Sequence, residues 1–140
     1  MSKFKQKGSS TVEFAMMVPL LLLLVFMVSE LGIMFYRLNA LTKSVQIAAR
    51  YLSVNDVTPP LDEATAKNLA VYGNTAGTGT AIVPGLTTTQ ISFPNAGSQH
   101  VQVTATYPAN WALPGAVIGL LGLSGDPLAL KASSVMRLAQ

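Results

Sequence analysis

The sequence predicts an α+β fold in which one long N-terminal helix packs against a small antiparallel β-sheet. Two patterns lead to this prediction. A long apolar stretch near the start passes, without any turn signal, into apolar residues that recur at helical spacing. The C-terminal part alternates apolar and polar residues, as strands with one buried face do. In such a fold, each layer buries the apolar surface of the other.

The composition indicates a membrane protein and argues against several other classes. Of the 140 residues, 50% are hydrophobic and 11% are charged. Cysteine is absent, which excludes disulfides and thiolate metal sites. The net charge of +3 arises from Lys3, Lys5 and Lys7, and without them six basic residues balance six acidic ones. We therefore expect no nucleic-acid partner.

The apolar stretch runs from Phe14 to Tyr36 and contains a single charge, Glu30. As a helix it would measure about 34 Å, which is enough to cross a bilayer. The lysine cluster before it predicts a single-pass protein with a cytoplasmic N-terminus and an extracytoplasmic C-terminal part. A secretory signal peptide is the alternative, but no small-residue cleavage site follows Val28.

The same helix is predicted to continue into water, from Ser10 to about Leu52. Pro19 lies near its start and should kink or loosen it. Beyond the apolar stretch, apolar residues follow one another at alternating spacings of three and four, which makes an amphipathic stripe. The stripe consists of Leu31, Met34, Leu38, Leu41, Val45, Ala48 and Leu52. We expect the sheet to cover Leu38, Leu41 and Val45.

A shorter helix and three strands are expected after this point. Asp62 suits the N-cap or first turn of a helix that runs to about Val71. Strands are expected over residues 89–93, 100–107 and 128–138, the first two forming a hairpin. Their inward faces would carry Thr89, Ile91 and Phe93, then Val101, Val103, Ala105 and Tyr107, then Leu128, Leu130, Ala132, Met136 and Leu138.

The apolar, glycine-rich segment 116–123 fits two roles. It is too short to span a bilayer and is flanked by Pro114 and Pro127. It either fills the core as a short helix or forms an apolar patch that contacts a neighbouring subunit.

Catalytic chemistry is poorly supported by the sequence. His100 is the sole histidine and falls at a polar position of an alternating strand. Asp62 and Glu63 are adjacent, so on a helix their carboxylates point in different directions. Neither a phosphate-binding loop nor a nucleophile elbow is present. We expect no enzyme, no catalytic residue, no metal and no cofactor.

The residues before the apolar stretch carry a more specific signal. A basic leader is followed by Gly8, by small polar residues, and by Glu13 just ahead of the apolar helix. This order resembles the processing signature of type IV pilins and pseudopilins. The resemblance implies that prepilin peptidase cuts after Gly8, so that Ser9 becomes the first residue and Glu13 the fifth.

Within that superfamily, residues 10–52 resemble the TadE family of pseudopilins from tight-adherence pilus systems. Most of the similarity lies in residues 12–15, 19–24, 30–32 and 48–51, and the C-terminal pieces "VQVTATYP" and "ASSVMRL" also resemble the family. The resemblance implies a pilin-like fold with a cleaved leader (1–8), a long helix (9–53, membrane-spanning in about 14–36) and an extracytoplasmic α+β domain (54–140).

The resemblance further implies a minor subunit that is held in the bacterial inner membrane and is then extracted into, or used to prime, a thin adhesive pilus. Its implied partners are prepilin peptidase, other pilin or pseudopilin subunits, the inner-membrane assembly machinery and the lipid bilayer. Ser9 and Glu13 would serve assembly, because a buried Glu13 carboxylate could pair with the Ser9 amine of a neighbour. Helix packing in the membrane would use Phe14, Pro19, Leu20 and Leu24.

A second interpretation belongs to another functional class. The chain would then be an unprocessed single-pass membrane protein whose outer domain binds a ligand or surface. Tyr107, Trp111 and the glycine-rich segment would form its recognition patch, since aromatic residues are favoured binding anchors.

Overall fold

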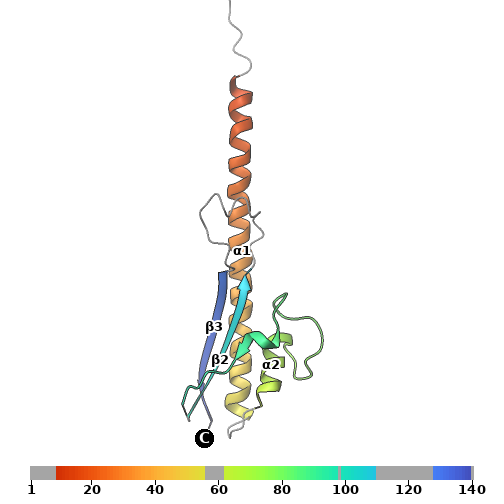
Figure 1. The fold of residues 1–140 in the computed structure, drawn as a ribbon, viewed down its shortest axis with the longest axis vertical. Coiled ribbons are helices and arrows are strands. Elements are labelled where there is room, and N and C mark those ends of the chain that lie inside the picture. Colours follow the sequence, from red (N-terminus) through yellow and green to blue (C-terminus); the bar gives the residue numbers. More distant parts are fainter. Residues whose placement is uncertain (1–8, 56–61, 98, 110–127, 140) are drawn as a thin grey trace, which may run out of the picture. The chain divides into compact units, whose positions relative to one another are not determined.

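The computed structural model describes residues 9–55, 62–97, 99–109 and 128–139 (Figure 1). Its elements are the helices α1 (Ser9–Asn55) and α2 (Glu63–Tyr72), the 3₁₀ helix η1 (Thr88–Gln90), and the strands β1 (Ile91–Ser92), β2 (His100–Ala109) and β3 (Leu128–Arg137). The three strands form one antiparallel sheet in the order β1-β2-β3. The predicted α+β class is therefore confirmed.

The chain divides into two compact units, Met1–Ile33 and Met34–Gln140. In the first unit, the described residues all belong to the N-terminal part of α1. The second unit contains the rest of α1 together with α2 and the sheet. The hydrophobic core lies entirely in this second unit.

The sheet owes its two faces to strict alternation in β2. Val101, Val103, Ala105 and Tyr107 are buried, while the residues between them are half-buried. β3 pairs with β2 along its full length, from His100 opposite Arg137 to Ala109 opposite Leu128. Because β3 keeps the same period, Ala132 is buried and Leu130, Met136 and Leu138 pack against the core. The inward faces predicted for these strands are confirmed for the side chains that the structure describes.

The predicted strand over residues 89–93 is wrong in its first half. Thr88–Gln90 form a 3₁₀ helix, and within the predicted range Ile91 and Ser92 are the residues that pair with β2. Gln90 closes the turn twice: its backbone N–H donates to the Thr87 carbonyl, and its side-chain oxygen accepts from the Thr87 backbone N–H. Such local bonds compete with strand pairing, and they leave Thr89 exposed.

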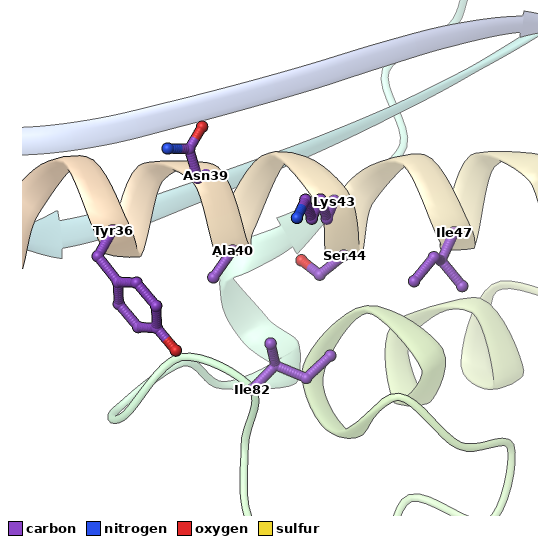
Figure 2. Close-up of a pocket in the computed structure, with 7 residues that line it drawn as sticks. All are labelled: Tyr36, Asn39, Ala40, Lys43, Ser44, Ile47 and Ile82. Carbon is purple, nitrogen blue, oxygen red and sulfur yellow. The ribbon is translucent and has the colours of Figure 1, made fainter.

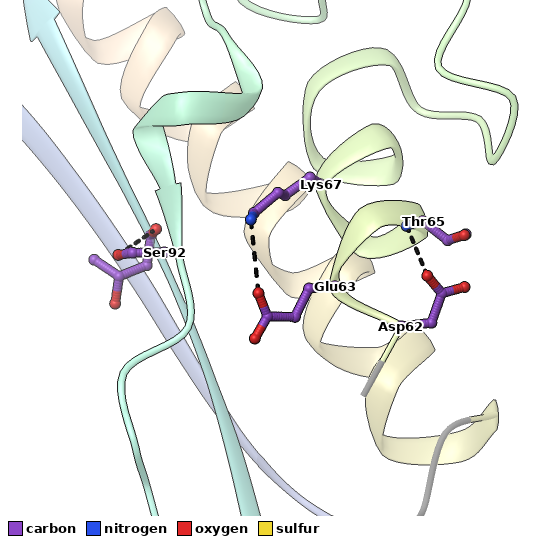
Figure 3. Close-up of polar contacts among 6 residues, drawn as sticks. Asp62, Glu63, Thr65, Lys67 and Ser92 are labelled. Carbon is purple, nitrogen blue, oxygen red and sulfur yellow. Dashed lines mark hydrogen bonds and ion pairs between the residues drawn. The ribbon is translucent and has the colours of Figure 1, made fainter. Parts of the chain in front are cut away.

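α2 begins and ends with recognisable caps. The Asp62 carboxylate accepts a hydrogen bond from the Thr65 backbone N–H at 3.1 Å, which confirms the predicted N-cap (Figure 3). At the other end, Gly73 takes the left-handed conformation (φ 74°) and its N–H donates to the Leu69 carbonyl. The helix buries Ala66, Ala70 and Val71.

Loop residues complete the core around this helix. Val83 and Leu86 are almost fully buried. The Ile82 backbone N–H donates to the Val71 carbonyl at 2.8 Å, and the Tyr107 hydroxyl donates to the Pro84 carbonyl at 2.8 Å. These hydrogen bonds connect the loop after α2 to α2 itself and to β2, the central strand of the sheet.

The C-terminal end of α1 is tied to the end of the chain. The Ala139 backbone N–H donates to the Ser53 carbonyl at 2.9 Å. The buried Ser53 hydroxyl donates to the Arg50 carbonyl and lies 4.0 Å from the Met136 sulfur. The backbone hydrogen bond and the contact with Met136 therefore hold the end of α1 against the C-terminal residues.

Candidate membrane and assembly site

The described part of α1 starts with Ser9, the residue that would follow the predicted cut. Glu13 lies four residues later, so both residues belong to the same face of the first helical turns. The Glu13 side chain is exposed. Gly8 and the rest of the predicted leader lie outside the described residues.

The helix beyond Glu13 presents apolar side chains to its surroundings. Large apolar residues are exposed at most positions from Val12 to Tyr36, among them Phe14, Leu20 and Leu24. Pro19 lies inside α1, and the helix continues through it. By length and composition α1 can cross a membrane, and none of its most apolar window is buried in the protein. Such a surface is stable in lipid and unfavourable in water.

The amphipathic stripe changes character along α1. Leu31 is exposed, whereas Met34 and Leu38 are half-buried. Leu41, Val45, Ala48 and Leu52 are fully buried in the core that includes the sheet and α2. The sequence analysis missed Ser44, which is also buried and whose hydroxyl donates to the Leu41 carbonyl at 2.8 Å. No periodic signal identifies a polar residue of this kind, because a local hydrogen bond makes its burial possible.

The remaining titratable groups that the structure describes are distributed rather than gathered. His100 is exposed at the start of β2, as its place in the alternating pattern predicts. Glu63 and Lys67 form an ion pair one turn apart on α2, at 3.6 Å (Figure 3). Within the described ranges, no group of three or more potential metal ligands occurs.

Asp62 has a shifted pKa with a clear structural cause. Hydrogen bonds from the Thr65 side chain and then from its backbone N–H hold the pKa of Asp62 below its ordinary value of 3.8. The role of this carboxylate is to cap α2.

A groove that the sequence analysis did not anticipate lies beside α1 in the second unit (Figure 2). It is lined by Tyr36, Asn39, Ala40, Lys43, Ser44, Ile47 and Ile82. The α1 residues share a face by their spacing of three and four, but Ile82 comes from the loop after α2. Only the folded chain brings it beside the helix. Of the alternative recognition patch, Tyr107 is buried and its hydroxyl donates to the Pro84 carbonyl, while Trp111 and the segment 116–123 lie outside the described residues.

Comparison with known proteins bears on the N-terminal part of the chain. The family model described as TadE-like protein matches residues 8–50. No curated protein and no solved structure matches the chain. The family match does not reach β2 and β3, so the resemblance of those strands stays a prediction. Over residues 8–50, which hold Gly8, Glu13 and most of α1, the chain is similar to the TadE-like family.

Proposed function

We propose that the chain is a minor pseudopilin of a tight-adherence pilus, cut by prepilin peptidase after Gly8. The match of residues 8–50 to the TadE-like family carries this proposal. The exposed apolar surface of α1 from Val12 onward supports it, because a pseudopilin needs such a surface to stay in the membrane before assembly. The processed subunit would stay in the inner membrane through α1 until it joins or primes a pilus.

Glu13 has a physical role in this proposal. The apolar surface that follows it seats the first turns of α1 at the edge of the hydrocarbon. A carboxylate in that environment is costly unless a cation or hydrogen-bond donors accompany it. After the cut, the Ser9 amine of a neighbouring subunit supplies such a cation. Since the two residues are four apart, their pairing would set an axial offset of about 6 Å between neighbours.

The exposed apolar side chains would then change partners without any change in the folded part. In the membrane, Phe14, Leu20 and Leu24 contact lipid; in a pilus, they contact the same segments of neighbouring helices. The core that holds Leu41 and Val45 is complete within one chain. Extraction from the membrane therefore does not require this core to rearrange.

Co-expression with a prepilin peptidase tests the processing step. We expect the wild-type chain to lose eight residues and Gly8→Ala to stay full length, with both followed by intact mass. Gly32→Ala is the matched control: it removes a glycine within α1, where an added Cβ has no neighbour within 4 Å, and it should be cut normally. A wild-type chain that keeps Met1 in the presence of active peptidase contradicts the proposal.

The role of Glu13 is tested separately from cleavage. Glu13→Gln removes the charge but keeps the shape, so we expect normal cleavage, a normally folded second unit and reduced recovery in sheared pili. Glu63→Gln, which removes a carboxylate from the surface of α2, should be recovered like the wild type. Equal recovery of Glu13→Gln and the wild type would show that the carboxylate does not guide assembly.

A further inference from the structure

The groove beside α1 combines a cation with apolar walls. It has a volume of about 270 Å³. Figure 2 shows Tyr36, Ser44 and Ile47 on the side of α1 where Ile82 lies, and Lys43 on the adjoining side. Tyr36 is 72% exposed, Ile47 49% and Ile82 38%. The Ser44 hydroxyl already donates to the Leu41 carbonyl, so the Lys43 ammonium and the Tyr36 hydroxyl are the groups best placed to donate to a bound molecule.

The charged residues that the structure describes on the groove's part of α1 are of one sign. Between Leu31 and Asn55, α1 contains Arg37, Lys43 and Arg50 and no acidic residue. Two carboxylates elsewhere in the second unit have other roles: Asp62 caps α2, and Glu63 pairs with Lys67. Within the described part of the chain, Lys43 forms no ion pair with a carboxylate. The groove therefore favours an anion from outside the chain.

The groove also lies next to the end of the apolar stretch. Tyr36 is the last residue of that stretch, and tyrosine is enriched where a membrane meets water. Lys43 follows seven residues later, about 10 Å along the helix. Helical side chains lean toward the N-terminus, and a lysine bends its long stem along apolar surface to place its ammonium in the headgroup layer. Arg50 lies a further 10 Å or so along α1, outside that layer.

We propose that this groove binds the headgroup of an anionic phospholipid. The Lys43 ammonium contacts the phosphate, the Tyr36 hydroxyl donates to a phosphate or glycerol oxygen, and Ala40 and Ile82 contact the glycerol and the start of an acyl chain. The occupant is a membrane lipid rather than a free phosphate, because the Lys43 ammonium lies beside apolar walls and within two helical turns of the end of the apolar stretch. This site is independent of cleavage and assembly.

Lipid retention by the full-length chain tests the proposal. The detergent-solubilised protein is mixed with phosphatidylglycerol or phosphatidylcholine, and bound lipid is counted by native mass spectrometry. We expect the wild type to retain phosphatidylglycerol in preference, and Lys43→Gln to retain it about fivefold less, the effect of one cation near a headgroup. Arg50→Gln, which loses the same charge from the same helix, should behave like the wild type, and Lys43→Arg should restore retention.

Three results would overturn the proposal. Equal losses in Lys43→Gln and Arg50→Gln would indicate attraction by net charge alone. Equal retention of the two lipids by the wild type would exclude a headgroup site. Displacement of the lipid by millimolar inorganic phosphate would show that the groove binds free phosphate. Circular dichroism of each variant establishes that the helices are intact, so a loss of lipid is not a loss of fold.

Discussion

Asp62 shows how a single side chain determines where an element begins. Its carboxylate accepts from Thr65 and so satisfies a backbone N–H that the first turn of α2 leaves unpaired. Because these hydrogen bonds favour the ionised form, the pKa of Asp62 is lower in the folded chain than in the unfolded one. The stabilisation is complete above the ordinary pKa of 3.8 and is lost as the pH falls through the lower folded value.

This linkage gives a prediction for the pH dependence of stability. We expect Asp62→Ala to lower the melting temperature of the second unit at pH 7, and to lower it less as the pH falls from 3.8 through the lower pKa that the Asp62 carboxyl has in the folded chain. Thermal unfolding followed by circular dichroism measures both. Asp62→Asn keeps a capping oxygen without a titrating group, so its melting temperature should vary less with pH over the acid range. Identical pH profiles for Asp62→Asn and the wild type would contradict the assignment.

Two glycines, one that caps α2 and one in the loop after it, have positive φ angles and different local surroundings. Gly73 (φ 74°) ends the helix, and a Cβ there would meet Ile82 at 3.4 Å, an ordinary contact. Gly77 (φ 68°) lies against Asn68, whose side-chain atoms would be 2.7–2.8 Å from an added Cβ. That asparagine donates to the Thr75 carbonyl and so holds the turn.

We therefore expect Gly77→Ala to destabilise the second unit more than Gly73→Ala does. Both variants lose the conformational freedom that glycine provides, at a cost of about 1 kcal/mol. Gly77→Ala must also displace Asn68 from its hydrogen bond. Chemical denaturation of the two variants side by side measures the difference, and an equal or reversed order would contradict the close contact at Gly77.

At the scale of elements, α1 has an N-terminal part with an exposed apolar surface and a C-terminal part that packs into the protein core. From Val12 to Tyr36, α1 exposes large apolar side chains, whereas from Leu41 to Leu52 it buries a stripe in a core of its own chain. The change occurs where the all-round apolar pattern gives way to a one-sided pattern. The face that α1 presents to the sheet is therefore determined by spacing, and its depth in the core by packing against α2 and β2.

The buried stripe can be tested with a matched pair on the same helix. Leu52 is fully buried, while Val54, two residues later, is 58% exposed. We expect Leu52→Ala to lower the free energy of unfolding by about 2–5 kcal/mol, because it leaves a cavity. Val54→Ala should change it by about 0.5 kcal/mol or less. Urea denaturation provides both values, and similar losses in the two variants would contradict the core assignment.

Periodic patterns made most of the fold predictable. Strict alternation in β2 identifies its inward face, and the spacing of Leu41, Val45 and Ala48 identifies the buried face of α1. Prediction failed where short-range hydrogen bonds outweigh a pattern, as at Thr88–Gln90. It also missed Val83 and Leu86, which are buried from a loop without periodicity, because only distant parts of the chain create their surroundings.

The candidate sites differ in the same way. The order from Gly8 to Glu13 is readable in the sequence, because a peptidase would recognise consecutive residues of the chain. The groove could not be predicted from the sequence. One of its lining residues is Ile82, which lies in a loop 39 positions after Lys43 and comes beside α1 only in the folded chain. Linear motifs are thus accessible to sequence reasoning, whereas assembled surfaces require the structure.

At the scale of the whole molecule, the two units have different requirements. The described residues of the unit Met1–Ile33 belong to a helix with no core of its own, and apolar side chains cover much of its surface. The unit Met34–Gln140 has a hydrophobic core shared by α1, α2 and the sheet. A chain built in this way needs lipid or other helices for its first unit. Anchoring followed by incorporation into a pilus would supply both in turn.

The N-terminal residue of the mature protein in its native cells tests the central claim most directly. N-terminal sequencing of protein taken from the inner membrane and from sheared pili distinguishes the alternatives. We expect Ser9 as the first residue in both fractions. A chain that begins before Ser9 and stays in the membrane would support the unprocessed binding protein, and a chain that begins beyond Val28 would indicate a secretory signal peptide; either result would contradict the proposed pseudopilin.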